Sequence, residues 1–200
     1  MRSSRPRKDG SPPVADSPHP SVTGVVHKRR RLVEWLARKR VPLGFATAVA
    51  TAILAVPTWD SWRVGLLVAV IGEAIRIWAA GHLEKGREVT RSGPYRWTAH
   101  PLYVGSSVLA LGVVIAAQSV VVLVLVLIYM VSTLTAAVRT EEAFLRGRFG
   151  DAYDEYRRSE GENTERRFSV ARAWRNKEYR AAIGILIGFG FLALRVATPI

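Results

Sequence analysis

The longest uncharged stretch of this chain is the 37-residue segment 102–138, which contains no Asp, Glu, Lys or Arg. A bilayer core of about 30 Å is crossed by roughly 20 helical residues, so the segment is too long for one crossing and fits two. Residues 116–119 are its most polar point, which predicts two helices of about 18 residues joined by a tight turn. We therefore expect His100, before the first helix, and Glu141 and Glu142, after the second, to lie close together.

Three further apolar runs, at residues 41–56, 64–80 and 181–198, are separated by charged stretches. This pattern predicts an all-α fold, a polytopic transmembrane helical bundle with about five spans that includes the hairpin 102–138. We expect residues 32–200 to form a single membrane-embedded domain, with an interfacial helix near residues 32–40. Gly184 and Gly188 lie on one face of the last span, which predicts close packing against a neighbouring helix.

The net charge of +13 is explained by membrane topology. Of the 29 Lys and Arg residues, 26 lie in segments 1–40, 81–100 and 139–180, which the five spans place on the same side. The positive-inside rule then predicts a cytoplasmic N-terminus and site, in the plasma (inner) membrane of a bacterium. No basic groove with interleaved aromatic residues accompanies the charge, so we expect no nucleic-acid partner. The absence of cysteine excludes disulfides, thiolate zinc sites and thiol nucleophiles.

Residues 1–31 are rich in Arg, Lys, Pro and Ser and cannot bury enough apolar surface to fold alone. We expect a disordered basic cytoplasmic tail. Two roles for it stay open: a topology signal, or electrostatic attraction to anionic membrane lipids.

Two charged residues, Glu73 and Arg76, lie three residues apart on one face of the second span. Unpaired charge inside a membrane is costly, so we expect the two side chains to pair. Either they line a polar cavity that faces the site, or they form a structural ion pair that holds helices together.

The start of the hairpin offers groups that suit a ligand. Pro101 fits the first helical turn, and the helix start leaves free N–H groups near His100 that favour an anion. Gly105 lets a helix or a ligand approach closely. Glu141 and Glu142 either oppose the dipole of a helix that stops there or are desolvated at the membrane surface, and a cationic ligand would offset either cost. A solvated acidic turn balanced by arginines is the alternative.

A set of motifs in a fixed order carries a family resemblance. Gly93-Pro94-Tyr95-Arg96 is followed by His100-Pro101-Leu102-Tyr103-Val104-Gly105, the apolar hairpin, Glu141-Glu142, and Phe149-Gly150 with Tyr153 and Tyr156. This combination, over residues 72–156, closely resembles the isoprenylcysteine carboxyl methyltransferase and phospholipid methyltransferase superfamily.

The resemblance implies an integral-membrane methyltransferase that uses S-adenosylmethionine, with a lipid-like or isoprenoid methyl acceptor. It implies a cofactor site on the cytosolic side formed by Tyr95, His100, Pro101, Leu102, Tyr103, Gly105, Glu141 and Glu142. Methyl transfer from a sulfonium needs no metal, so catalysis should consist of alignment and exclusion of water. Candidate catalytic residues are Glu73, Arg76 and Arg167, the last as the group that orients an anionic acceptor, with Arg166 as its rival.

Two positions depart from the family pattern. Ala99 stands where the family often has Arg, so the missing cation is supplied by Arg96 or Arg91, or is absent. Residues 159–165 form an acidic and polar insert before Arg166 and Arg167, which weakens inference about the acceptor.

Two other functions remain open on the sequence. Sterol reductases resemble this superfamily in their C-terminal helices, which would imply NADPH as the cofactor. A noncatalytic membrane scaffold is the other alternative, prompted by Ala99. The acceptor, the methylated atom and the oligomeric state stay undetermined.

Overall fold

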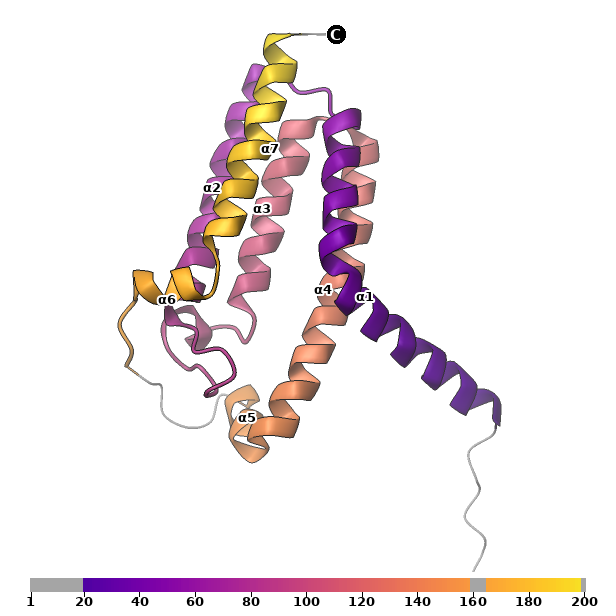
Figure 1. Cartoon of the computed structure of the whole chain (residues 1–200), viewed down its shortest axis with the longest axis vertical. Coiled ribbons are helices and arrows are strands. Elements are labelled where there is room, and N and C mark those ends of the chain that lie inside the picture. The colour runs from indigo at the N-terminus through magenta and orange to yellow at the C-terminus, as the bar shows by residue number, and fades with distance from the viewer. Residues whose placement is uncertain (1–19, 159–164, 199–200) are drawn as a thin grey trace, which may run out of the picture. The chain divides into compact units, whose positions relative to one another are not determined.

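The structure is a computed structural model that describes the backbone of residues 20–158 and 165–198, and side chains from residue 31 onward. The described residues form helices and no β-strand, which confirms the all-α prediction (Figure 1). The helices are α1 (Pro20–Leu54), α2 (Trp59–His82), the 3-10 helix η1 (Gly93–Arg96), α3 (Pro101–Ala117), α4 (Val120–Phe149), α5 (Asp151–Arg157), α6 (Val170–Arg175) and α7 (Tyr179–Ala197).

The chain divides into two compact units, residues 1–32 and 33–200, and α1 runs through the boundary. Of the expected tail, residues 1–19 lie outside the described part. Residues 20–31, expected to be disordered, are helical as the first part of α1. Pro20 is its first residue, where a missing N–H costs no hydrogen bond.

The four apolar runs of the sequence lie mostly in five helices, α1, α2, α3, α4 and α7. Helices α2, α4 and α7 are long and apolar enough to cross a membrane, whereas α3 is a shorter apolar helix of 17 residues. Helix α1 fails this criterion because its apolar half, which ends at Leu54, shares the helix with the cations near Arg40. The helical membrane bundle is confirmed, but among the described residues three helices, rather than the expected five, are long and apolar enough to count as spans.

The turn of the hairpin falls where the sequence predicted it. Gln118 ends α3 in the left-handed conformation, with φ 47°, and the Ser119 hydroxyl accepts the Val122 N–H at 3.4 Å to cap α4. The Val56 N–H, from the α1–α2 loop, donates to the Ala117 carbonyl at 2.8 Å. Helix α4 is longer than expected, because it continues through Glu141 and Glu142 to Phe149.

Helices α2 and α3 are in backbone contact through glycines. A Cβ atom on Gly105 would lie 2.7 Å from the Gly72 carbonyl oxygen, and one on Gly65 would lie 2.5 Å from that of Gly112. No real side chain tolerates such distances, so the glycines fix the separation of the two helices.

The expected close packing at Gly184 and Gly188 is wrong. A Cβ atom on either residue would meet no atom within 4 Å. Helix α7 instead buries Phe189 and Leu192, and the Trp62 indole of α2 donates to the Phe189 carbonyl at 2.8 Å. Bulky side chains thus define the packed face of α7, and these glycines lie on another face.

The C-terminal end of α2 is capped by the segment around α6. The exposed carbonyls of a helix end need donors. Arg172 donates to Gly81 at 2.5 Å, and Asn176 donates to Ala80 and Leu83 at 2.8 and 3.0 Å. Arg172 also pairs with Glu84 at 2.8 Å and thereby lowers the pKa of that carboxyl. These contacts hold the loop that leads to η1 against α6.

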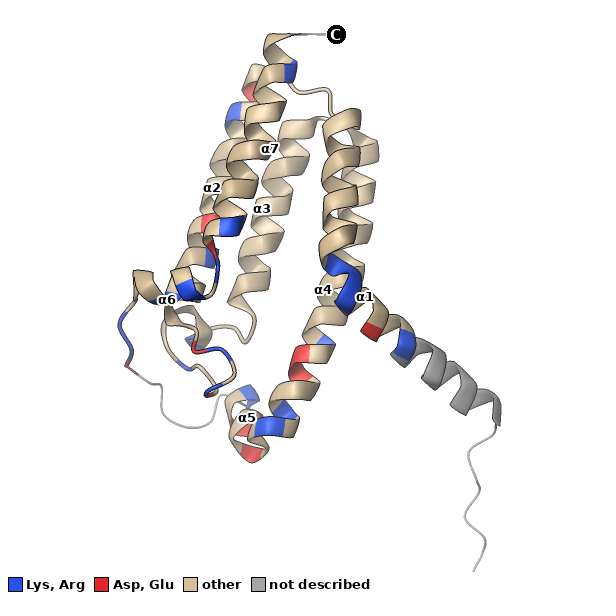
Figure 2. Ribbon diagram, viewed as in Figure 1, with Lys and Arg blue, Asp and Glu red and all other residues tan. Residues whose placement is uncertain are grey.

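Within residues 33–200, charged residues gather at the α5–α6 end of the helices, with a few at the opposite end (Figure 2). The middle parts of the helices are nearly free of charge, as a bilayer requires.

Candidate functional site

The segment before α3 is bent by the turn that the sequence predicted. Gly93 has φ 56°, and Pro94 starts the 3-10 helix η1. Pro101 is the first residue of α3 and fully buried. Two of the N–H groups expected to be free at this helix start have partners: the Tyr103 N–H donates to the His100 carbonyl at 3.0 Å, and the His100 N–H donates to the Thr98 hydroxyl at 3.3 Å. The first turn is tightened, so few donors remain for an anion.

The hairpin brings the two halves of the predicted cofactor site together. The His100 Nε2 lies 3.4 Å from a carboxylate oxygen of Glu142, and the Tyr103 hydroxyl donates to Glu141 at 2.6 Å. The His100 and Tyr103 rings stack with centroids 5.5 Å apart. The expected proximity of His100 and the Glu141-Glu142 pair is confirmed.

The candidate site also contains Arg157, which was not predicted from the sequence. Its guanidinium lies 3.1 Å from Glu142, on the same oxygen that faces His100. Gly150, with φ 51°, ends α4 and lets α5 turn back. Tyr153, Tyr156 and Arg157 share one face of α5, and this i, i+3, i+4 spacing is the signal that could have indicated a role for Arg157.

Helix α5 is attached to the segment around η1 by Tyr156. Its hydroxyl donates to the carbonyls of Tyr95 and Thr98, at 2.8 and 3.4 Å. Burial, and then the charge of Glu141, raises the pKa of Tyr95. Arg91 donates to the Ala152 carbonyl at 2.9 Å and adds a second link to α5. Tyr95 thus lies buried beside the carboxylates, as support for the site.

Gly105 and Leu102, which were also predicted to bind the cofactor, have contacts with α2 and within α3, respectively. Gly105 faces α2, where an added Cβ would lie 2.6 Å from the Arg76 side chain. The Leu102 carbonyl accepts the Ser106 hydroxyl at 2.8 Å. Of the two partners expected for Gly105, a helix or a ligand, the structure places the helix.

Glu73 and Arg76 form an ion pair with an N–O distance of 3.3 Å, as expected. Arg76 also pairs with Glu178, at the start of α7, and donates to the Ser106 hydroxyl of α3. Glu73 and Glu178 are buried. The cluster links three helices. Glu73 and Arg76 line neither the cavity beside Arg167 nor the cavity between α3 and α4, which favours a structural ion pair over a polar cavity that faces the site.

Arg167 lies apart from these contacts. It lines a cavity of about 270 Å³ together with Arg96, Glu165 and Arg166. Arg166 is engaged with Glu88 at 2.6 Å and with the His82 carbonyl at 3.4 Å. In the part of the chain that the structure describes, no contact joins Arg167 to Glu73, Arg76 or Glu142. Most of the predicted polar insert, residues 159–164, lies outside that part.

The side chains around Glu141 and Glu142 fit the charges of S-adenosylmethionine. Two carboxylates are suitable acceptors for an α-ammonium group and for ribose hydroxyls. The Tyr153 hydroxyl is buried without a hydrogen-bond partner among the described residues, and burial followed by the charge of Glu142 raises its pKa. A buried polar atom without a partner beside the carboxylates is consistent with a site for a polar ligand. No cluster of His, Asp and Glu suited to a metal ion occurs in the described ranges.

The model of the phospholipid methyltransferase family matches residues 62–152. The matched segment runs from the first turn of α2 into α5 and includes His100, Tyr103, Glu141 and Glu142, but not Arg157 or Arg167. Searches of curated proteins and of solved structures gave no match. The family match and the apolar helices support an integral-membrane methyltransferase that acts on lipid-like substrates. The match confirms, for residues 62–152, the resemblance to the isoprenylcysteine carboxyl methyltransferase and phospholipid methyltransferase superfamily.

Proposed function

We propose that this protein is an S-adenosylmethionine-dependent methyltransferase of the isoprenylcysteine carboxyl O-methyltransferase type, with a lipid-like or isoprenoid acceptor at the cytosolic membrane face. The supporting observation is the convergence of Tyr103 on Glu141, and of His100 and Arg157 on Glu142, at one end of the hairpin. S-adenosylmethionine, when bound, supplies an electrophilic methyl group on a positively charged sulfur.

The two carboxylates differ in what already neutralises them. Glu142 faces Arg157 and His100, whereas the hydrogen-bond partner of Glu141 is a neutral phenol. Glu141 is therefore the better partner for the α-ammonium group, and Glu142 for ribose hydroxyls. Both side chains are held in place by contacts to other elements, so that little side-chain entropy is lost when the cofactor binds.

Arg167 is the better of the two candidates for the anionic group of the acceptor. Arg96, Arg166 and Arg167 line the same cavity, but the Arg166 guanidinium is held by Glu88 and by the His82 carbonyl. Arg96 also suits the role of the cation that Ala99 lacks, because Arg91 is engaged with Ala152 and Glu155. A guanidinium pair would fix a carboxylate acceptor before methyl transfer.

The proposal is tested by calorimetry on the detergent-purified protein with S-adenosylmethionine, S-adenosylhomocysteine and NADPH in parallel. We expect the first two to bind, and a Glu141→Gln and Glu142→Gln double variant to lose at least about tenfold in affinity, since hydrogen bonds to charged groups contribute about 1.5–3 kcal/mol each. Asp60→Asn, at the opposite end of α2, is the matched control and should bind normally.

Unchanged affinity in the folded double variant would refute the assignment of the carboxylates. Binding of NADPH alone would replace the methyltransferase by a reductase. A screen with labelled S-adenosylmethionine against thioether carboxylates and phospholipids then identifies the acceptor class.

A further inference from the structure

Helices α3 and α4 touch at both ends and separate in between. At the hairpin turn, Ala116 and Ala117 pack with Val122 and Val126 in the apolar core. At the other end, the contact from Tyr103 to Glu141 joins the helices through long side chains. Glycines hold α3 against α2, and α4 continues past the start of α3 to α5 (Figure 1).

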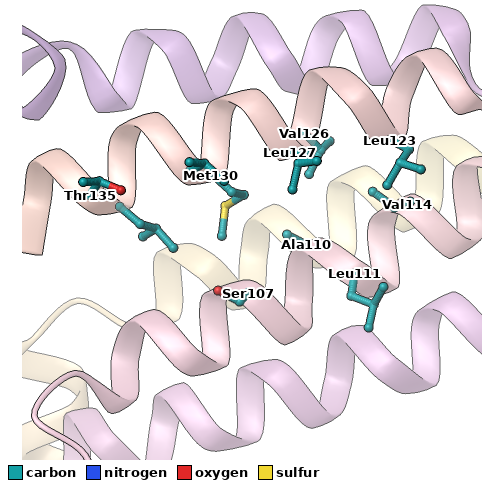
Figure 3. Close-up of a pocket in the computed structure, with 11 residues that line it drawn as sticks. Ser107, Ala110, Leu111, Val114, Leu123, Val126, Leu127, Met130 and Thr135 are labelled. Atoms are coloured by element: carbon teal, nitrogen blue, oxygen red, sulfur yellow. The ribbon is translucent and has the colours of Figure 1, made fainter.

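An elongated cavity of about 370 Å³ lies between these two contacts (Figure 3). Ser107 and Thr135 line the end near the site, whereas Val114 and Leu123 line the end near the hairpin turn. At about 1.5 Å per residue, Leu123 and Thr135 are about 18 Å apart along α4. The cavity therefore runs along the hairpin rather than across it.

The lining of the cavity is apolar. Its wall consists of Leu, Val, Ala and Met side chains, with two hydroxyl residues, both at the end near the site. The Ser107 hydroxyl is satisfied within its own helix, where it donates to the Tyr103 carbonyl at 3.0 Å. Water finds too few partners in such a space, and a void would forfeit dispersion contacts. At this depth in a bilayer the suitable occupant is a hydrocarbon chain.

The position of the cavity indicates which molecule this hydrocarbon chain belongs to. Ser107 lies about one helical turn, roughly 6 Å, from Tyr103, and Thr135 about 9 Å from Glu141. A chain that fills the cavity therefore ends beside the proposed cofactor site. Leu111 and Leu127 are more than half exposed, so the cavity is open to the bilayer from the side.

We infer that the cavity between α3 and α4 binds the hydrocarbon chain of the methyl acceptor, and that Val114 and Leu123 at its far end limit the chain length. This inference rests on the proposed methyltransferase function. The polar head then lies at the open end near Tyr103 and Glu141, and selection among acceptors operates on the chain as well as on the head.

The test is photo-cross-linking of the full-length protein in nanodiscs. The probe is a long-chain phosphatidylethanolamine with a diazirine at the end of one acyl chain. We expect labelling near Val114 and Leu123 to exceed labelling at Leu186, an exposed residue of α7. Added long-chain N-acetyl-S-alkylcysteine should displace the probe from the cavity, and the short-chain homologue should not.

Two variants make the test specific. Ala110→Phe fills the middle of the cavity and should lower labelling and long-chain affinity about tenfold, since the contacts of two or so methylene groups are lost. Ile128→Phe, on the exposed face of α4 outside the cavity, is the matched control and should change neither. Leu123→Ala should extend the cavity and shift the preference toward longer chains.

Equal effects of Ala110→Phe and Ile128→Phe, or labelling that no competitor displaces, would overturn the inference and leave only bulk lipid between the helices. Calorimetry with S-adenosylmethionine on the same variants separates the two proposals. Ala110→Phe should retain cofactor affinity, whereas failure of the wild-type protein to bind the cofactor would refute the methyltransferase proposal whatever the cross-links show.

Discussion

Adjacent carboxylates near the C-terminal end of a helix are unfavourable, because the helix dipole and the membrane surface both oppose negative charge. In this protein α4 continues through Glu141 and Glu142, and their partners come from two other helices. Tyr103 of α3 donates to Glu141, and Arg157 of α5 pairs with Glu142. These contacts therefore offset part of the electrostatic cost of the two carboxylates. From the sequence alone, a cationic ligand was expected to offset that cost.

Tyr156 stabilises the site through its neutral phenol. Burial, followed by the neighbouring Tyr153, raises its pKa to about 12 from the ordinary value of 10.0. A raised pKa means that the stabilisation is complete below about pH 10 and is lost as the pH rises through about 12. We predict that Tyr156→Phe lowers stability by about 1 kcal/mol at neutral pH, through loss of the bonds to Tyr95 and Thr98.

The same variant tests the direction in which stability changes with pH. Thermal unfolding in detergent should show a difference between wild-type protein and Tyr156→Phe that shrinks as the pH rises above about 10. A difference that stays constant over this range would mean that the phenol is not held neutral by the fold.

Some contacts of the site could be predicted from the sequence, and others could not. His100 and Glu142 meet because a charge-free hairpin has to return to the same membrane face, which is a consequence of length alone. Arg157 reaches Glu142 only because Gly150 turns α5 back, and no periodicity gives the direction of that turn. Ion-pair partners beyond a loop follow from tertiary geometry, not from spacing.

At the scale of helices, glycines act where they touch a neighbour and not where their spacing suggests contact. Gly72 lies against the backbone of Leu109 and Gly105, whereas Gly188 faces open space. We predict that Gly72→Ala costs about 1–3 kcal/mol through overpacking. Gly188→Ala is the matched control and should be neutral or slightly stabilising, because Ala is the better helix former.

Thermal unfolding of the two glycine variants in the same detergent checks this prediction. Equal stability of Gly72→Ala and Gly188→Ala would show that α2 and α3 can separate without cost. In that case the close packing that holds α3 away from α4 would not be imposed by the glycines.

The helix contacts could be predicted from the sequence only in part. The α3–α4 turn was predicted from the most polar point of the uncharged segment, at residues 116–119, and the Glu73–Arg76 pair from their i, i+3 spacing. Capping of α2 by Arg172 and Asn176 joins residues about ninety positions apart, and a six-residue helix has too short a pattern to place them. Glu178 joins the Glu73–Arg76 pair for the same tertiary reason.

Within residues 33–200, the contacts between helix ends fall into two groups, one at each end of the helices. At one end, Arg195 of α7 donates to the Ile53 carbonyl at 2.8 Å, and Ser61 of α2 donates to the Ala116 carbonyl at 3.2 Å. The other end holds the α6 contacts with α2 and the proposed cofactor site. The apolar helices thus alternate in direction, as the five expected spans require, and most cations lie at the end of the site.

This arrangement predicts the orientation in the membrane. The end rich in Lys and Arg should be cytoplasmic, so Lys85 should lie inside and Asp60 outside. The chain contains no cysteine, so single substitutions Lys85→Cys and Asp60→Cys give labelling without background, and both positions are exposed. In intact cells a membrane-impermeant maleimide should label Asp60→Cys, and it should label Lys85→Cys only after permeabilisation. The reverse pattern would place the proposed cofactor site outside the cytoplasm, away from its supply of S-adenosylmethionine, and labelling of both in intact cells would mean that the chain inserts in two orientations.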